Sequence, residues 1–382
     1  MKNNRFLIII SVFLSSGQSQ VDADLNVQSG YYSNVFNSVV SGSQKYIYVD
    51  GLLKVPITQS LNAYGGLDGV FYNPTTSYSN YSAESGLFGF KQINDMAMVN
   101  GGLYFSTDQY ESTFNYYNSR NFGGYINLIY FINSRLNAKF GYSLEKSNYD
   151  DLDGVNNIDH QLSIKMIRSF DSGSAIMGYS SFGIQKFDSF SPQASADGAG
   201  RNITETQQFD SNSTFNLRLR VSHSITEKAG IALTVEHKEI LALNSDILFF
   251  DQYFYNPLQD RFQWQGEQID LKMTLVPKHD IHITGTTTFR TRTYDNNPVY
   301  DYDIGSETYK LENGNYVLLE NMRVDENATL EMSVEKIWFK DIYEFEKGLG
   351  LNLTIGYGLN LSNDPIYNSS GIYSFLSFQY YY

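Results

Sequence analysis

The chain has 382 residues, a formal net charge of −14 and no cysteine. The negative charge argues against a nucleic-acid partner, which would require a basic face, and an exported chain without cysteine must fold without disulfides. Tyrosine and phenylalanine are abundant, at 31 and 26 residues. No linker or break in composition divides the sequence into domains, so one repeated pattern has to account for nearly the whole chain.

The first residues have the pattern of an export signal. A basic start precedes an apolar-rich run from Phe6 to Leu14, and small residues follow up to Ser19. This order is typical of a signal peptide, and the apolar run is too short to cross a bilayer as a helix. We expect residues 1–19 to be removed, with cleavage after Ser19 or after Ala23, and residues 20–382 to form the mature chain.

From about Leu25 onward, apolar residues alternate with polar ones in segments of roughly ten residues, as they do in barrel strands. The segment at 121–132 is apolar on both faces, which indicates that something packs against its inner side, such as an inward-folded loop. Pro56 is expected to end the second segment. Up to that region, the expected strands lie near 25–35, 45–55, 60–72, 81–92, 97–106 and 121–132.

The alternation becomes clearer in the second half of the chain. Leu217 and Leu219, for example, alternate with Arg218 and Arg220. Since successive side chains of a strand point to opposite faces, one face of each strand is apolar and the other is polar or charged. The terminal segment brings the count to about sixteen strands, within a range of 14 to 18.

The connections also alternate, between tight turns and longer loops. Short turns on one side, long loops on the other and an even strand count are the outer-membrane pattern, with both termini in the periplasm. The longest loop is expected to contain its own hairpin, with its turn at Glu312–Asn315. Tight turns are expected at 133–134, 171–173, 226–230 and 277–280, and longer loops at 148–157, 191–208, 244–261 and 294–326.

The last twelve residues, Gly371 to Tyr382, place Phe378, Tyr380 and Tyr382 on one apolar face. This segment resembles the terminal strand of bacterial outer-membrane β-barrel proteins, in which a final aromatic residue is read by the barrel-insertion machinery. The resemblance implies an all-β fold, a transmembrane antiparallel up-and-down β-barrel in the outer membrane of a Gram-negative-type bacterium, in contact with its lipid. A soluble β-sandwich or propeller is the alternative, but its outward face should be polar.

Motifs of catalysis are absent from the sequence. The five histidines have neither metal-ligand spacing nor a Gly-x-Ser-x-Gly elbow near them, so we expect no enzyme, no metal and no cofactor. Acidic residues gather in the expected loops, for example at 150–153 and 301–307. They indicate that the loops form a hydrated, charged surface at the rim of the barrel. The more specific alternative is that divalent cations bridge these carboxylates to lipid head groups.

Charges on the inward face of the second half of the chain are the strongest candidate site. Cross-strand salt bridges that stabilise a polar lumen are the simpler interpretation; a charged wall that sorts solutes is the functional one. A barrel of this size is wide enough for water. The inward bases are Arg218, Arg220, Lys238, Lys272, Arg290 and Arg292, and the inward acids are Glu236, Asp270, Glu331 and Glu335.

Strand number, turn pattern and charged wall resemble the general diffusion porins. That resemblance implies that the third external loop, here Thr107–Arg120, folds into the lumen and places Asp108 and Glu111 opposite the arginines. The Pro-Glu-Phe-Gly-Gly motif of that loop in the family is absent from this sequence. The expected function is passive diffusion of small hydrophilic solutes. The alternative is a structural or adhesive barrel that docks partners through loops rich in Tyr, Asn and Asp, such as Phe249–Tyr255. The sequence leaves solute identity and any homo-oligomer open.

Overall fold

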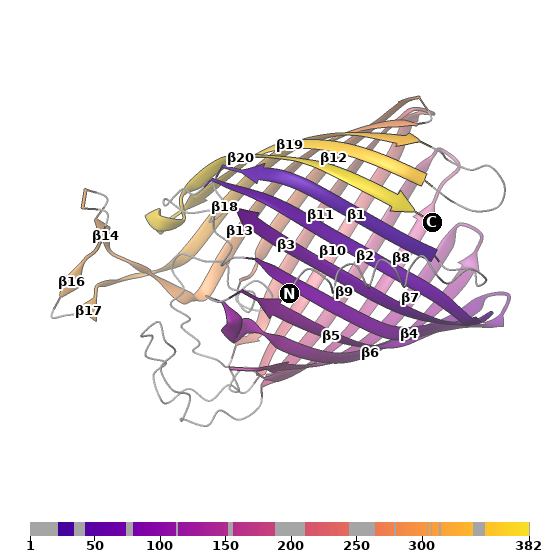
Figure 1. Cartoon of the computed structure of the whole chain (residues 1–382), viewed down its shortest axis with the longest axis horizontal. Coiled ribbons are helices and arrows are strands. Elements are labelled where there is room, and N and C mark those ends of the chain that lie inside the picture. Colours follow the sequence, from indigo (N-terminus) through magenta and orange to yellow (C-terminus); the bar gives the residue numbers. More distant parts are fainter. Residues whose placement is uncertain are drawn as a thin grey trace, which may run out of the picture.

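The computed structural model describes residues 22–33, 43–73, 79–111, 114–151, 156–187, 211–243, 264–278, 280–303, 305–306, 308–312, 315–338 and 348–381. In this part of the chain, sixteen long strands form one closed antiparallel barrel (Figure 1). Each strand pairs with its neighbours in sequence, and the last pairs with the first, for example Val27 with Phe378. The predicted fold class and strand number are therefore confirmed.

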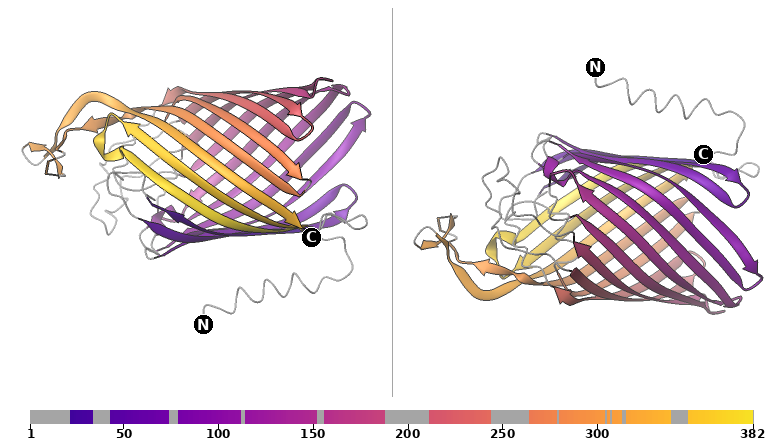
Figure 2. Two further views of the ribbon diagram at one scale, coloured as in Figure 1. Left: turned by 90° about the horizontal axis from the view of Figure 1, so that it is seen from above. Right: turned by 90° about the horizontal axis from the view of Figure 1, so that it is seen from below.

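The strands are long enough to cross a bilayer when tilted, as Figure 2 shows them. They are β1 (Asp22–Tyr32), β2 (Gln44–Thr58), β3 (Leu61–Asn73), β4 (Asn80–Asn94), β5 (Ala97–Tyr110), β6 (Ser119–Asn133), β7 (Leu136–Tyr149), β8 (Asn157–Ser169), β9 (Ser174–Phe187), β10 (Ser211–Thr226), β11 (Ala229–Leu243), β12 (Gly266–Lys278), β13 (Ile281–Tyr300), β18 (Leu318–Trp338), β19 (Gly348–Ser362) and β20 (Ser369–Tyr381).

Two predicted boundaries are wrong. Strand β2 does not end at Pro56 but continues to Thr58. Pro56 pairs with Asn62 beside the turn, just before a register shift, where a missing backbone N–H disturbs the ladder least. The expected loop at 294–326 is largely strand, because β13 and β18 extend to Tyr300 and from Leu318.

The two ends of the barrel differ in the way that the turn pattern predicts. Tight turns join β2 to β3, β4 to β5, β6 to β7, β8 to β9, β10 to β11 and β12 to β13 at the end where β20 finishes (Figure 1). At the other end, β13 and β18 reach beyond their neighbours and carry two small hairpins. These pair β14 (Tyr302–Asp303) with β15 (Thr308–Tyr309), and β16 (Leu311–Glu312) with β17 (Asn315–Tyr316). The predicted hairpin around Glu312–Asn315 is thus confirmed.

The outward face of the wall is apolar. Leu217 and Leu219 on β10 are 48% and 49% exposed, and Leu330 and Met332 on β18 are 60% and 57% exposed. Such a continuous apolar outer surface is destabilising in water, and in a closed barrel it is stabilised by lipid. The soluble alternatives, which require a polar outer face, do not fit. No helix in the described residues is long and apolar enough to cross a membrane.

On the inward face, five tyrosines lie over glycines of the neighbouring strand. In each case the tyrosine and the glycine are direct partners across the two strands, and a Cβ added to the glycine would meet the tyrosine ring. The rings therefore lie along the wall in the space where another side chain would stand, and this packs the wall. The pairs are Tyr46 with Gly30, Tyr64 with Gly86, Tyr104 with Gly123, Tyr125 with Gly102, and Tyr373 with Gly356.

A buried arginine ties the loop between β19 and β20 to the extended strands. Arg323 on β18 donates two hydrogen bonds to the Asp325 carboxylate, and both residues are buried. Its guanidinium lies 4.3 Å from the ring centre of Tyr294 and 3.3 Å from that of Tyr367 in the short helix η4 (Pro365–Tyr367). Burial raises the pKa of Tyr367 to about 12 despite the nearby guanidinium, so its hydroxyl stays protonated. This cluster fixes the loop over the strand ends.

Candidate functional site

The lumen wall is the candidate site, because strand alternation sends the polar side chains of every strand into it. On β1 to β5 the inward charges are almost all acidic. Within these strands, Lys54, near the tight-turn end, is the one inward base. The inward carboxylates are Asp22, Asp24, Asp50, Asp68, Glu84 and Asp108.

Hydrogen bonds hold these carboxylates against the wall. The Ser82 hydroxyl donates to Asp68, and the Tyr64 hydroxyl donates to Glu84 at 2.5 Å. Asp50 and Asp68 are direct cross-strand partners, so two like charges stand side by side. Because no ammonium or guanidinium neutralises that pair within the described residues, this half of the wall presents a negative potential to the lumen.

Asp108 belongs to this acidic wall and not to an inward-folded loop. It lies in β5, where Ser119 and Asn121 on β6 donate hydrogen bonds to its carboxylate at 3.0 and 2.9 Å. Glu111 follows directly after β5, and its backbone N–H donates to the carbonyl oxygen of Ser79 at 2.9 Å. The predicted loop at Thr107–Arg120 is therefore wrong at both ends, since cross-strand hydrogen bonds extend β5 and β6 into it.

The opposite half of the wall carries a net positive charge, because the inward bases of β10 to β13 outnumber the inward acids Glu236 and Asp270. Arg218, Arg220, Lys272, Arg290 and Arg292 all lie on β10, β12 or β13 and have inward parity, as the alternation predicted. In a ring of sixteen strands, β9 to β13 stand eight strands away from β1 to β5, which places them across the lumen. The wall is thus divided into an acidic half and a basic half.

Some of these bases have polar partners on the neighbouring strand, and others make no ion pair. Arg218 donates two hydrogen bonds to Glu236, at 2.8 and 2.6 Å, and Arg290 donates to the Gln268 side chain at 2.6 Å. Arg220 and Lys272 make no ion pair within the described part of the chain. Cross-strand pairing, the simpler interpretation of the sequence, is therefore present at Arg218, while the sorting of solutes by the remaining charge stays a prediction.

An aromatic ring positions two further bases. The Lys238 ammonium lies 3.8 Å and the Arg292 guanidinium 4.7 Å from the ring centre of Trp264, which precedes β12. Cation–π contacts of this kind restrain long side chains that would otherwise be mobile. The role of Trp264 could not be predicted, because it lies between the loop expected at 244–261 and the alternating pattern that begins at Ile269.

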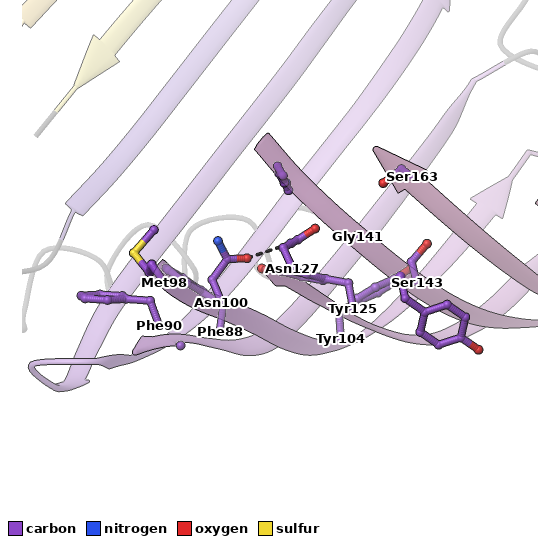
Figure 3. Close-up of a pocket in the computed structure, with 13 residues that line it drawn as sticks. Phe88, Phe90, Met98, Asn100, Tyr104, Tyr125, Asn127, Gly141, Ser143 and Ser163 are labelled. Carbon is purple, nitrogen blue, oxygen red and sulfur yellow. Dashed lines mark hydrogen bonds between the residues drawn. The ribbon is translucent and has the colours of Figure 1, made fainter. Parts of the chain in front are cut away.

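A recess in the wall lies over β4 to β8, with a volume of about 790 Å³. Figure 3 shows Phe88, Phe90 and Met98 beside Asn100, whose side chain accepts a hydrogen bond from Asn127 at 2.7 Å. Tyr125 on β6 also lines the recess. Of the inward apolar side chains of β6, Tyr125 alone lines this recess, and the packing of a segment inside the wall stays a prediction.

Sequence reasoning missed most of the acidic half. Asp24, Asp50 and Asp68 alternate with apolar neighbours just as the arginines do, but they lie in glycine- and tyrosine-rich strands with less distinct polarity. The same two-residue period would have identified them. Their position opposite the basic strands could only follow from the closed ring.

The closed barrel, apolar outer surface and charged interior define an outer-membrane β-barrel of porin-like architecture. No protein-family model matches the chain, and no curated protein matches it. Solved structures do. The OccAB1 structure of Acinetobacter baumannii has 10% identity over 96% of this chain and 99% of that chain, with a TM-score of 0.49. A bacterial polysaccharide outer membrane secretin has 7% identity over 94% and 98%, with a TM-score of 0.48.

Proposed function

We propose that this barrel is a channel for the passive diffusion of small hydrophilic solutes across the outer membrane. The observation that carries the proposal is the division of the lumen wall into facing acidic and basic halves. A buried core would not leave Asp50 beside Asp68, or Arg220 and Lys272 unpaired, because isolated charges in a dry interior are strongly destabilising. Charges in these positions are stable when water fills the lumen. We propose no catalytic role for them.

Planar-bilayer recording of the purified protein tests this function. The wild-type barrel should give discrete conductance steps in potassium chloride. Replacing two wall bases (Arg220→Gln with Lys272→Gln) should shift the reversal potential toward cations, and replacing two wall acids (Asp50→Asn with Asp68→Asn) should shift it toward anions. We expect changes of about two- to threefold in the permeability ratio, since wall charges are partly screened in 0.1 M salt.

The matched control is Leu271→Ala, which changes the lipid-facing side of the strand that carries Lys272. It should leave selectivity unchanged. A folded barrel that never conducts would refute the channel. Shifts in the same direction for the acidic and the basic pair would refute the assignment of the two halves.

A partner-binding role is the second candidate, and the extension of β13 and β18 favours it. The two hairpins project beyond the rest of the barrel (Figure 1), and Leu311 and Leu319 are 59% and 41% exposed there. Exposed apolar residues at the end of a projecting element suit a contact surface. The loop segment Phe249–Tyr255 lies outside the described residues. Deleting residues 302–316 should abolish partner or surface binding while conductance persists.

Export and assembly are proposals of the same kind. Residues 1–19, as a cleaved signal peptide, lie outside the described residues. Phe378 and Tyr380 stand on the outward face of β20 beside β1, at 47% and 43% exposure, and Tyr382 is outside the described part. We propose that these three aromatics form the signal for the barrel-insertion machinery. Replacing them with alanine should reduce the amount of inserted barrel in cells.

A further inference from the structure

A row of five aromatic rings crosses the seam where the barrel closes, on the inward face of β20, β1, β2 and β3. We name it the tyrosine row: Phe375, Tyr373, Tyr32, Tyr46 and Tyr72. Consecutive ring centres are 6.5, 5.7, 5.3 and 6.2 Å apart. Spacings of 4.5–7 Å are those of rings in contact, so the row is a continuous aromatic surface and not a set of isolated side chains.

The rings lie along the wall. Tyr46 occupies the space over Gly30, and Tyr373 occupies the space over Gly356. Tyr46 is almost fully buried, while Tyr32, Tyr72 and Tyr373 are partly exposed. The row therefore offers part of its ring surface to a solute that passes close to this side of the lumen.

Its position is at the loop end of the barrel. Tyr32 and Tyr373 are direct cross-strand partners near the end of β1, and Tyr72 stands next to the last residue of β3. A solute that enters from the side of the longer loops meets the row before it meets Asp50 and Asp68.

The charge around the row is negative. The Tyr373 hydroxyl donates a hydrogen bond to the Glu331 carboxylate at 3.0 Å. No inward lysine or arginine occurs on β19, β20, β1 or β3, and Lys54 of β2 stands at the opposite end of its strand. β10 and β11, which carry the inward bases Arg218, Arg220 and Lys238, stand eight strands from β2 and β3 and so face the row across the lumen. A cation is thus attracted to the wall that carries the rings and repelled by the wall that faces them.

Ring faces and carboxylates act in the same direction on a cation. The face of an aromatic ring is negative, and the attraction for a cation is strongest when the cation is poorly hydrated. Alkylated ammonium groups meet that condition and also have an apolar surface to bury. A neutral sugar could stack on the rings, but it would gain nothing from the net charge of this wall.

We propose that the tyrosine row binds small organic cations with an alkylated ammonium group and guides them into the lumen. This inference rests on the proposed channel function and adds a preferred class of solute to it. Each exposed ring in contact should contribute about two- to fivefold in apparent affinity, the range of cation–π contacts at partly exposed sites.

Choline and its uncharged carbon isostere, 3,3-dimethylbutan-1-ol, are the probes, with glucose as the sugar comparison. In planar bilayers, added choline should reduce the potassium current in a saturable way, and the isostere and glucose should not. Isothermal titration calorimetry of choline with the detergent-solubilised barrel gives the same comparison without requiring an open pore.

Tyr32→Leu and Tyr72→Leu remove rings, while Tyr32→Phe and Tyr72→Phe keep them. Each leucine variant should weaken choline binding about two- to fivefold, and the phenylalanine variants should bind within a factor of two of wild type. The control is Tyr31→Leu, which removes a neighbouring tyrosine on the lipid-facing side. Heat-modifiable migration in gels shows whether each variant is a folded barrel.

Equal effects of choline and its isostere, stronger binding of glucose, or unchanged choline binding in both leucine variants would overturn the inference. Potassium conductance without any choline effect would refute the tyrosine row alone. Calorimetric binding of choline without conductance would refute the channel and leave the row as a binding site.

Discussion

Gly123 tests whether the inward tyrosines hold the wall together by occupying the space over glycines. A Cβ at this position would lie 2.6 Å from Cε1 of Tyr104, and the ring would have to move. Moving it breaks the hydrogen bond that the Tyr104 hydroxyl donates to Glu145 at 2.5 Å. Gly123→Ala should therefore destabilise the barrel although it adds only a methyl group.

The magnitude follows from three contributions. A lost hydrogen bond to a charged group costs about 1.5–3 kcal/mol, and overpacking costs about 1–3 kcal/mol. The smaller conformational freedom of alanine in the unfolded chain offsets about 0.4–1 kcal/mol. We expect a net loss of about 1.5–5.5 kcal/mol in the free energy of unfolding.

Urea unfolding from phospholipid vesicles, followed by the fluorescence of the two tryptophans, measures this loss. Gly178→Ala and Gly285→Ala are matched controls, because an added Cβ there has no atom within 4 Å. In a double-mutant cycle, Gly123→Ala should cost almost nothing once Tyr104→Ala has removed the ring. Equal stability of Gly123→Ala and Gly178→Ala would refute the reasoning.

Two further predictions concern the loop end. Arg323→Ala leaves the Asp325 carboxylate buried without its guanidinium partner. The free energy of local opening at residues 363–368 should therefore fall by about 3–5 kcal/mol, which is measured as faster hydrogen exchange. The control Lys310→Ala, which removes an exposed ion pair, should leave the exchange rate unchanged. Hydrogen bonds from the Ser306 hydroxyl and the Gly305 N–H lower the pKa of Asp303. The ionised carboxylate therefore stabilises this turn fully at pH values above the unfolded-state pKa of about 3.9. This stabilisation is lost as the pH falls through the lowered pKa of the folded state. A spin label on Leu311→Cys, in a chain without other cysteines, should become more mobile below about pH 4. The substitution Asp303→Asn should remove this pH dependence. Unchanged mobility of the label down to about pH 2 would contradict the role of Asp303.

The sequence by itself determined the fold class. Alternation such as Leu217, Arg218, Leu219 and Arg220 specifies which face of a strand meets lipid, because successive side chains point to opposite sides. Tight turns and longer connections specified the two ends. The predicted strand ends at Pro56 and along β5 were wrong, because pairing with a neighbour extends a strand beyond its apolar pattern.

Only the tertiary structure decided which charges and rings share the lumen. Alternation places Asp50 and Arg220 inward, but nothing in the local pattern says that their strands stand eight apart in a closed ring. The tyrosine row likewise joins Tyr373 to Tyr32, which lie more than three hundred residues apart in the chain and meet only because β20 pairs with β1. Closure of the barrel creates these neighbours, so a local period of two residues can predict the wall but not what faces it.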